Sequence, residues 1–191
     1  MTKAITPLGY ALMGLINQKP GSGYALRKLF ETTPMGNYSS SPGSIYPALA
    51  GLGRMGLVEA RGGKGRAKGL FHLTPAGEAA FQAWLMASVD GRDLAAAMLR
   101  FAFLQDHPDR SLTFAFLDSF AAAAASEAAA LKAFLDGDFG RAMPLQSRLA
   151  VKHGLGQFES SAQWAVWAKR VLEDGEGAEA VNISGSTAPS A

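Results

Sequence analysis

The sequence contains no cysteine, and only three histidines occur among its 191 residues. The absence of cysteine excludes disulfides, thiolate zinc sites and a cysteine nucleophile, and it fits a reducing cytoplasm. The first residues, Met-Thr-Lys-Ala-Ile-Thr-Pro, lack the apolar core of a signal peptide. No apolar run approaches the roughly 20 residues that span a bilayer. These absences predict a cytoplasmic protein without a membrane partner.

The motifs of common enzymes are also missing. There is no Gly-x-Ser-x-Gly elbow, and the glycine-rich residues 62–69 do not fit the phosphate-binding Gly-x-x-x-x-Gly-Lys-Ser/Thr pattern. The three histidines are scattered, and residues 106–109, Asp-His-Pro-Asp, are better explained as a helix boundary than as a metal site. We therefore predict no catalytic residue, no cofactor, no metal site and no enzymatic activity.

Charge is unevenly distributed along a chain whose formal net charge is only +2. Residues 1–85 hold nine Lys/Arg and three Asp/Glu, whereas residues 86–191 hold nine Lys/Arg and thirteen Asp/Glu. A basic half favours a polyanionic partner, while an acidic half is repelled by one and favours protein or small-molecule partners. The charge pattern thus divides the chain into two functional halves.

Residues 1–89 show the pattern of a winged helix-turn-helix domain. Helices are predicted from Thr6 to Ile16, from a cap at Ser22, and from a cap at Ser41 to a stop at Gly56. Two short strands, residues 57–60 and 70–73, then flank a glycine-rich loop, and Thr74 caps a fourth helix that runs towards Val89. In this order the loop is the wing.

Residues 90–173 form a second, wholly helical part in this interpretation. Helices are predicted over residues 94–104, 111–135 and 145–172, the last with a kink at Gly154 and Gly156, and residues 136–140 break the chain. Residues 174–191 are rich in Gly, Glu, Ser and Ala, which favours a mobile tail. The predicted fold class is mainly α with a small β-hairpin: an N-terminal winged helix-turn-helix and a C-terminal helical dimerisation domain.

The third helix begins with residues suited to close approach to DNA. A start of Ser-Pro-Gly-Ser offers backbone N–H groups and small hydroxyl side chains, so its N-terminus can come near phosphates and the major groove. The basic residues of the wing would neutralise phosphates. The simpler alternative is an ordinary helix start followed by a soluble turn. The residues that we expect to contact DNA are Tyr24, Ser39, Ser40, Ser41, Gly43, Ser44, Tyr46, Pro47, Lys64, Arg66 and Lys68.

Residues 41–49, Ser-Pro-Gly-Ser-Ile-Tyr-Pro-Ala-Leu, together with residues 56–58, Gly-Leu-Val, and residues 73–77, Leu-Thr-Pro-Ala-Gly, resemble the PadR family of transcriptional regulators. Residues 12–26 resemble the opening motif of that family, with Ser22 where many members carry histidine. Over residues 94–172 the resemblance is to members with a longer helical C-terminal domain. It implies a DNA-binding homodimer, usually a repressor, that a ligand relieves in some members.

Aromatic side chains in the C-terminal half have two competing interpretations. They could form the core and dimer interface, or they could line a pocket for a small aromatic effector, as in family members that sense phenolic acids or drugs. The alanine run at residues 121–125 favours close helix packing and hence an interface. The candidate residues are Phe101, Phe120, Phe158, Trp164, Trp167 and Val171.

Taken together, these features predict a homodimeric DNA-binding transcriptional regulator, most simply a repressor of a double-stranded operator. A small aromatic effector that relieves repression is compatible with the second half. The alternative from another class is a small-molecule-binding or protein-interaction dimer that does not bind an operator.

Overall fold

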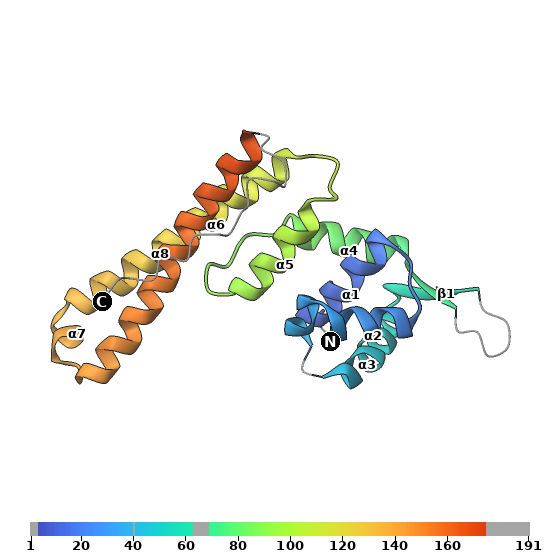
Figure 1. Cartoon of the computed structure of the whole chain (residues 1–191), viewed down its shortest axis with the longest axis horizontal. Coiled ribbons are helices and arrows are strands. Elements are labelled where there is room, and N and C mark those ends of the chain that lie inside the picture. Colours follow the sequence, from blue (N-terminus) through green and yellow to red (C-terminus); the bar gives the residue numbers. More distant parts are fainter. Residues whose placement is uncertain (1–3, 40, 63–68, 175–191) are drawn as a thin grey trace, which may run out of the picture. The chain divides into compact units, whose positions relative to one another are not determined.

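The computed structural model describes residues 4–39, 41–62 and 69–174 of the chain (Figure 1). Within it the chain forms two compact units. The first comprises Met1–Ser88 and Asp93–Thr113, and the second comprises Val89–Arg92 and Phe114–Ala191. The predicted C-terminal tail and the three basic wing residues Lys64, Arg66 and Lys68 lie outside the described residues.

The first unit contains three helices, a two-stranded antiparallel hairpin and a fourth helix, as the sequence predicts. Figure 1 shows α1, α2 and α3 gathered beside the hairpin. This order confirms the predicted winged helix-turn-helix. The elements are α1 (Pro7–Gln18), α2 (Gly23–Thr32), the 3-10 turns η1 (Pro34–Tyr38) and η2 (Pro42–Ser44), α3 (Ile45–Arg54), β1 (Val58–Arg61), β2 (Leu70–Leu73), α4 (Pro75–Leu85) and α5 (Leu94–Leu104).

Three of the predicted helix caps are formed. The hydroxyls of Thr6, Ser22 and Thr74 each accept a hydrogen bond from the backbone N–H three residues ahead, at 3.1, 3.2 and 3.0 Å. Thr74 also donates its hydroxyl proton to the carbonyl of Gly56 at 2.6 Å. Gly56 has a φ of +70°, which favours glycine at the residue that ends α3. The caps therefore connect the end of α3 to the start of α4.

The hairpin is joined to the turn between α1 and α2. Val58 of β1 pairs with Leu73 of β2, so the first strand begins one residue later than predicted. The N–H of Phe71 donates to the carbonyl of Gly21 at 2.9 Å, which forms an isolated antiparallel bridge. The base of the wing is thereby held to the helix-turn-helix.

Helix α5 packs with the winged helix, although the sequence analysis placed residues 94–104 in the second domain. A β-carbon on Gly14 of α1 would lie 2.3 Å from the ring of Phe103, so the missing side chain is what admits this ring. Phe103 also meets Phe81 of α4 edge to face, with 5.7 Å between ring centroids. The compact unit thus includes α5, and its boundary differs from the one predicted at residue 89.

Arg100 fixes α5 to the end of α4. Its side chain is buried, and its Nη1 donates to the carbonyls of Ala87 at 2.7 Å and Ser88 at 3.3 Å. The guanidinium lies over the ring of Trp84, which stacks on Tyr10 at 4.5 Å between centroids. Burial lowers the pKa of Arg100 from its usual value. The arginine thus stabilises carbonyls that follow α4.

The second unit is an antiparallel pair of long helices, α6 (Ser111–Asp136) and α8 (Leu145–Glu173), connected through the short α7 (Asp138–Ala142). Lys169 Nζ lies 2.7 Å from Asp118 Oδ1, and Phe120 meets Trp164 edge to face at 6.2 Å between centroids. These two contacts align the start of α6 with the end of α8 (Figure 1). Helix α8 is assigned as one helix through Gly154 and Gly156. The chain breaks at Gly137, within the predicted residues 136–140, between the end of α6 and the start of α7.

Helix α6 is long and apolar enough to cross a membrane, judged by length and composition only. This helix corrects the expectation that no apolar run approaches the length that spans a bilayer. Only 28% of its most apolar window is buried within this chain. The core helix of a soluble protein passes the same test, so length and composition alone do not assign this helix to a membrane. They identify α6 as an apolar helix, much of whose surface no other part of this chain buries.

Candidate nucleic-acid interface

The N-terminal ends of α2 and α3 form the centre of the candidate site. Ile45, Leu49 and Leu52 are buried and hold one side of α3 against the core. On α2, Leu26 and Phe30 do the same. Each helix therefore has a buried side that anchors it and an exposed side that can meet a partner.

Tyr46 connects the two helix ends. A β-carbon on Gly23, the first residue of α2, would lie 2.7 Å from Cε1 of Tyr46, so the tyrosine ring lies directly against the α2 backbone. The residue as a whole is nevertheless 39% exposed. Tyr46 thus both packs α3 on α2 and presents part of its side chain to the surface.

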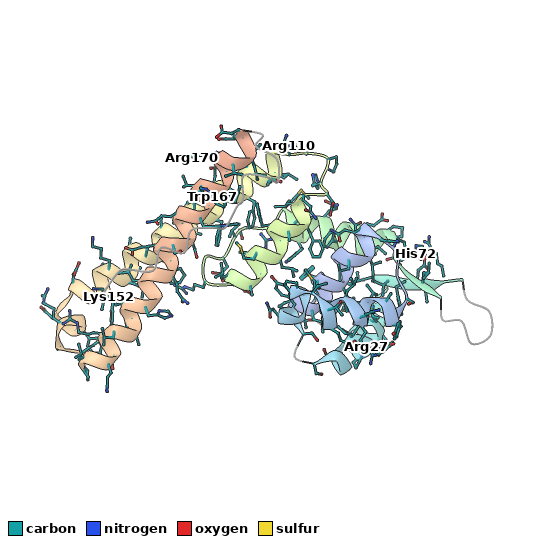
Figure 2. All side chains as sticks on the ribbon, in the orientation of Figure 1. Arg27, His72, Arg110, Lys152, Trp167 and Arg170 are labelled. Atoms are coloured by element: carbon teal, nitrogen blue, oxygen red, sulfur yellow. The ribbon has the colours of Figure 1, made fainter. Side chains whose placement is uncertain are left out.

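Tyr24 is the other exposed tyrosine of this region. It lies one residue into α2 and is 62% exposed. The guanidinium of Arg27, which is labelled in Figure 2, lies 5.8 Å from the centre of the Tyr24 ring. Arg27 also forms an ion pair with Glu31 at 3.5 Å. Tyr24 and Tyr46 therefore place one aromatic side chain at the start of each helix.

The start of α3 differs from the predicted one. Ser41 has an extended backbone with no side-chain cap, and Pro42–Ser44 form a 3-10 turn before the α-helix begins at Ile45. Pro47 explains the delay, because it lacks the N–H that would bond to the carbonyl of Gly43 in an α-helix that began earlier. A helical turn thus begins at Pro42 as predicted, but it is a 3-10 turn, and the α-helix itself begins about one turn later.

The serines before α3 bond mainly to one another. Ser39 Oγ and Ser44 Oγ lie 2.7 Å apart, and they lie 2.7 and 2.6 Å from the carbonyl oxygen of Ser41. Two hydroxyl protons serve these three contacts, so both protons are used inside the loop. The serines thus shape the turn, and donation to a phosphate would require breaking one of these bonds. Ser40 lies outside the described residues.

Gly43 and Pro47, two further residues predicted to contact DNA, do not obstruct a partner that approaches α3. Gly43 and Pro47 are exposed, and a β-carbon on Gly43 would meet only Ser41 Oγ, at 3.7 Å. Arg54, which the sequence analysis did not select, lies at the end of the same helix and is exposed. Its position seven residues after Pro47, two helical turns along the same side, was the available signal.

The aromatic residues of the second half have different environments. Phe120 is fully buried, between Phe116 at 6.0 Å and Trp164 at 6.2 Å. Trp167, labelled on α8 in Figure 2, is 50% exposed. Phe101, Phe158 and Val171 are half-buried, Phe101 on α5 and the other two on α8. The predicted set is therefore split between α5 and the helix pair, and between core and surface.

No metal centre is suggested by the described ranges, in which no group of three or more His, Cys, Asp or Glu side chains could hold an ion. The fold and the exposed ends of α2 and α3 define a winged helix-turn-helix protein, a class built to place a helix in the DNA major groove. Residues 12–83 match the model of the Transcriptional regulator PadR-like family.

Several solved structures are similar to the chain over most of its length. Bacillus subtilis PadR in complex with operator DNA is 19% identical, with a TM-score of 0.40 over 88% of this chain and 99% of that one. The PadR-like regulator BC1756 from Bacillus cereus is 18% identical, with a TM-score of 0.39 over 88% and 99%. Bacillus subtilis PadR in complex with p-coumaric acid is 19% identical, with a TM-score of 0.39 over 87% and 99%. No curated protein shows significant similarity to the chain.

Proposed function

We propose that this protein is a cytoplasmic, homodimeric repressor that binds a double-stranded DNA operator and has no enzymatic activity. The observation that carries the proposal is the joint presentation of the α2 and α3 N-termini, with Tyr46 packed across Gly23 and Tyr24 exposed beside it. Helix N-termini attract phosphate through their free N–H groups and the helix dipole. Two helix N-termini on one surface could therefore both bind phosphates of a DNA backbone.

The charge of the N-terminal half supports the same partner. Residues 1–85 carry nine basic and three acidic side chains, and three of the basic ones belong to the wing sequence. Phosphate neutralisation by Lys and Arg dominates the affinity of most DNA-binding proteins.

The second unit supports a dimer. Two helices bury only a narrow seam between them, and α6 leaves most of its apolar window uncovered. On α8, Val166 and Trp167 are 46% and 50% exposed. A second copy of the chain would cover these surfaces and bring two recognition helices to half-sites about one DNA turn apart. Repression would follow from blocking access of RNA polymerase to the promoter.

A small aromatic effector is the second role proposed for the helix pair. The cluster of Phe116, Phe120 and Trp164 has the chemistry to accept a planar ring, but Phe120 is already packed on both sides. Displacing a packed ring is costly, so an effector would have to enter beside the cluster rather than replace a member. A dimer that binds ligands or proteins without an operator remains the competing function.

Fluorescence anisotropy with DNA from upstream of the protein's own gene tests the main proposal. We expect specific binding whose affinity falls steeply between about 50 and 200 mM salt, and weaker binding to a shuffled sequence of the same length. Equal affinity for both DNAs, or none for either while the protein remains dimeric, would favour the competing function.

A further inference from the structure

The outward side of α3 is almost bare. Opposite its buried side lie Pro47, Ala50 and Gly51, none of which extends beyond a few atoms. Pro47 and Ala50 are exposed. A helix with such short side chains can lie deep in a groove, because nothing holds its backbone away from the surface that it meets.

Arg54 is the exception on this side. It is the one charged residue of Ile45–Arg54, and its exposed side chain folds back along the helix. Its Nη2 lies 3.9 Å from the position that a β-carbon on Gly51 would take, one turn closer to the N-terminus. Since helical side chains point towards the N-terminus, the missing side chain of Gly51 leaves room for the guanidinium in the middle of the bare surface.

A shallow cavity beside Arg54 continues this surface. It has a volume of about 320 Å³, and Pro47, Ala48, Gly51 and Arg54 of α3 contribute to its lining together with residues 4, 6 and 9 near the start of α1. Thymine methyl groups pack well against such small apolar side chains. The cavity therefore offers an apolar surface next to a cation.

Other arginines of this unit are already engaged. Arg27 forms an ion pair with Glu31 at 3.5 Å, and Arg61 forms one with Glu59 at 2.6 Å. Among the ion pairs of the described residues, none includes Arg54. The fork of this guanidinium thus remains available for an external acceptor.

We infer that Arg54 reads a guanine in the major groove of the operator, next to a thymine that packs on Pro47 and Ala50. The inference rests on the proposed DNA-binding function and specifies its target. A guanidinium bonds the O6 and N7 of guanine in a bidentate manner, which is the commonest specific contact of arginine with DNA. The surrounding small side chains let the helix approach the bases closely, so the side chain of Arg54 is long enough to reach the guanine edge.

Selection from a random double-stranded DNA pool tests this role with three proteins: wild type, Arg54→Ala and Arg54→Lys. We expect the wild-type motif to contain a guanine with a neighbouring thymine in each half-site. Arg54→Ala should lower the preference for that guanine about tenfold while leaving the other positions unchanged. Arg54→Lys should keep the charge and recover only part of the preference, because lysine lacks the planar fork.

Arg61→Ala is the matched control, since it removes an exposed arginine of the same unit that is paired with Glu59. Its selected motif should equal that of the wild type, and melting temperatures confirm that each variant is folded. An unchanged motif for Arg54→Ala overturns the inference, as does an equal loss of affinity on every sequence, which would indicate a phosphate contact. A wild-type protein that selects no motif and binds no DNA overturns the proposed function itself.

Discussion

The ring of Tyr46 occupies the space that a side chain at Gly23 would need, with Cε1 only 2.7 Å from the position of a β-carbon there. The first residue of α2 and the second residue of α3 are thus complementary in shape. The glycine admits the ring, and the ring sets the spacing between the two helix ends that we propose to meet DNA.

Gly23→Ala should move the Tyr46 ring and weaken operator binding about tenfold with little change in melting temperature. The ring is partly exposed and can swing outward, so relieving the clash costs little folding free energy. Anisotropy and thermal unfolding measure the two effects. In a Tyr46→Ala background the same substitution should have no further effect on binding, and full additivity would contradict the coupling.

Tyr46→Phe should retain the packing on Gly23 and remove only the hydroxyl. If that hydroxyl donates to DNA, operator affinity falls about tenfold or more at an unchanged melting temperature, because hydrogen bonds to charged groups contribute about 1.5–3 kcal/mol. Equilibrium titration against the operator provides the measurement. Wild-type affinity would show that Tyr46 contributes through its ring alone.

Gly14→Ala should destabilise the protein, because the new methyl group would lie 2.3 Å from the ring of Phe103. Overpacking of this kind costs about 1–3 kcal/mol of unfolding free energy. Gly156→Ala in α8 is the control: nothing lies within 4 Å of its β-carbon, so we expect a gain of about 0.5–1 kcal/mol from helix propensity. Denaturant unfolding compares them, and equal effects would argue against the packing of α5 on α1.

Replacing Lys64, Arg66 and Lys68 together by alanine should weaken binding to every DNA sequence. These residues lie outside the described part of the chain, so the prediction rests on the sequence alone. Each lost phosphate contact should reduce the slope of log affinity against log salt by about 0.9. A salt titration with an unchanged slope would remove the wing from the interface.

Trp164 and Trp167 should respond differently to replacement by alanine. Trp164 packs on Phe120, so its loss should destabilise the helix pair by about 3–5 kcal/mol. Trp167 is half exposed, so its loss should leave folding intact and shift the protein towards monomer at micromolar concentration. The divided dimer then loses the roughly hundredfold gain of two linked half-sites.

Sedimentation velocity with and without operator separates these outcomes. Valine at position 166 is exposed to a similar degree on the same helix, so Val166→Ala serves as a milder control. A Trp167→Ala protein that remains a dimer but loses its response to an aromatic ligand would assign that ring to an effector site. A Trp167→Ala protein with normal assembly, DNA binding and ligand response would show that Trp167 is a surface residue with neither role.

Local signals predicted the helices of the first unit well. Thr6, Ser22 and Thr74 act within three residues of their own position, and Gly56 adopts a φ that glycine favours, so the sequence contains all that these boundaries need. Ser41 failed as a cap because a proline six residues later changed which backbone bonds could form. The break predicted at residues 136–140 falls at Gly137, whose extended backbone separates the end of α6 from the short α7.

The candidate site was predicted only in part. Tyr24, Tyr46 and Pro47 are exposed at the ends of α2 and α3 as expected, although their contacts with DNA remain predictions. Ser39 and Ser44 looked like donors for phosphate, but they share their protons within the loop. Their hydrogen bonds depend on the fold of the turn, which a list of residue types does not contain.

The sequence by itself determined the winged-helix order, the caps at Thr6, Ser22 and Thr74, and the division of charge, because each depends on residues close together in the chain. The tertiary structure decided which distant residues meet: Gly14 admits Phe103, Gly23 admits Tyr46, and Arg100 reaches the carbonyls after α4. In each case the partners are at least 12 residues apart. Their contact follows from how helices pack rather than from any local preference, so only the folded chain shows it.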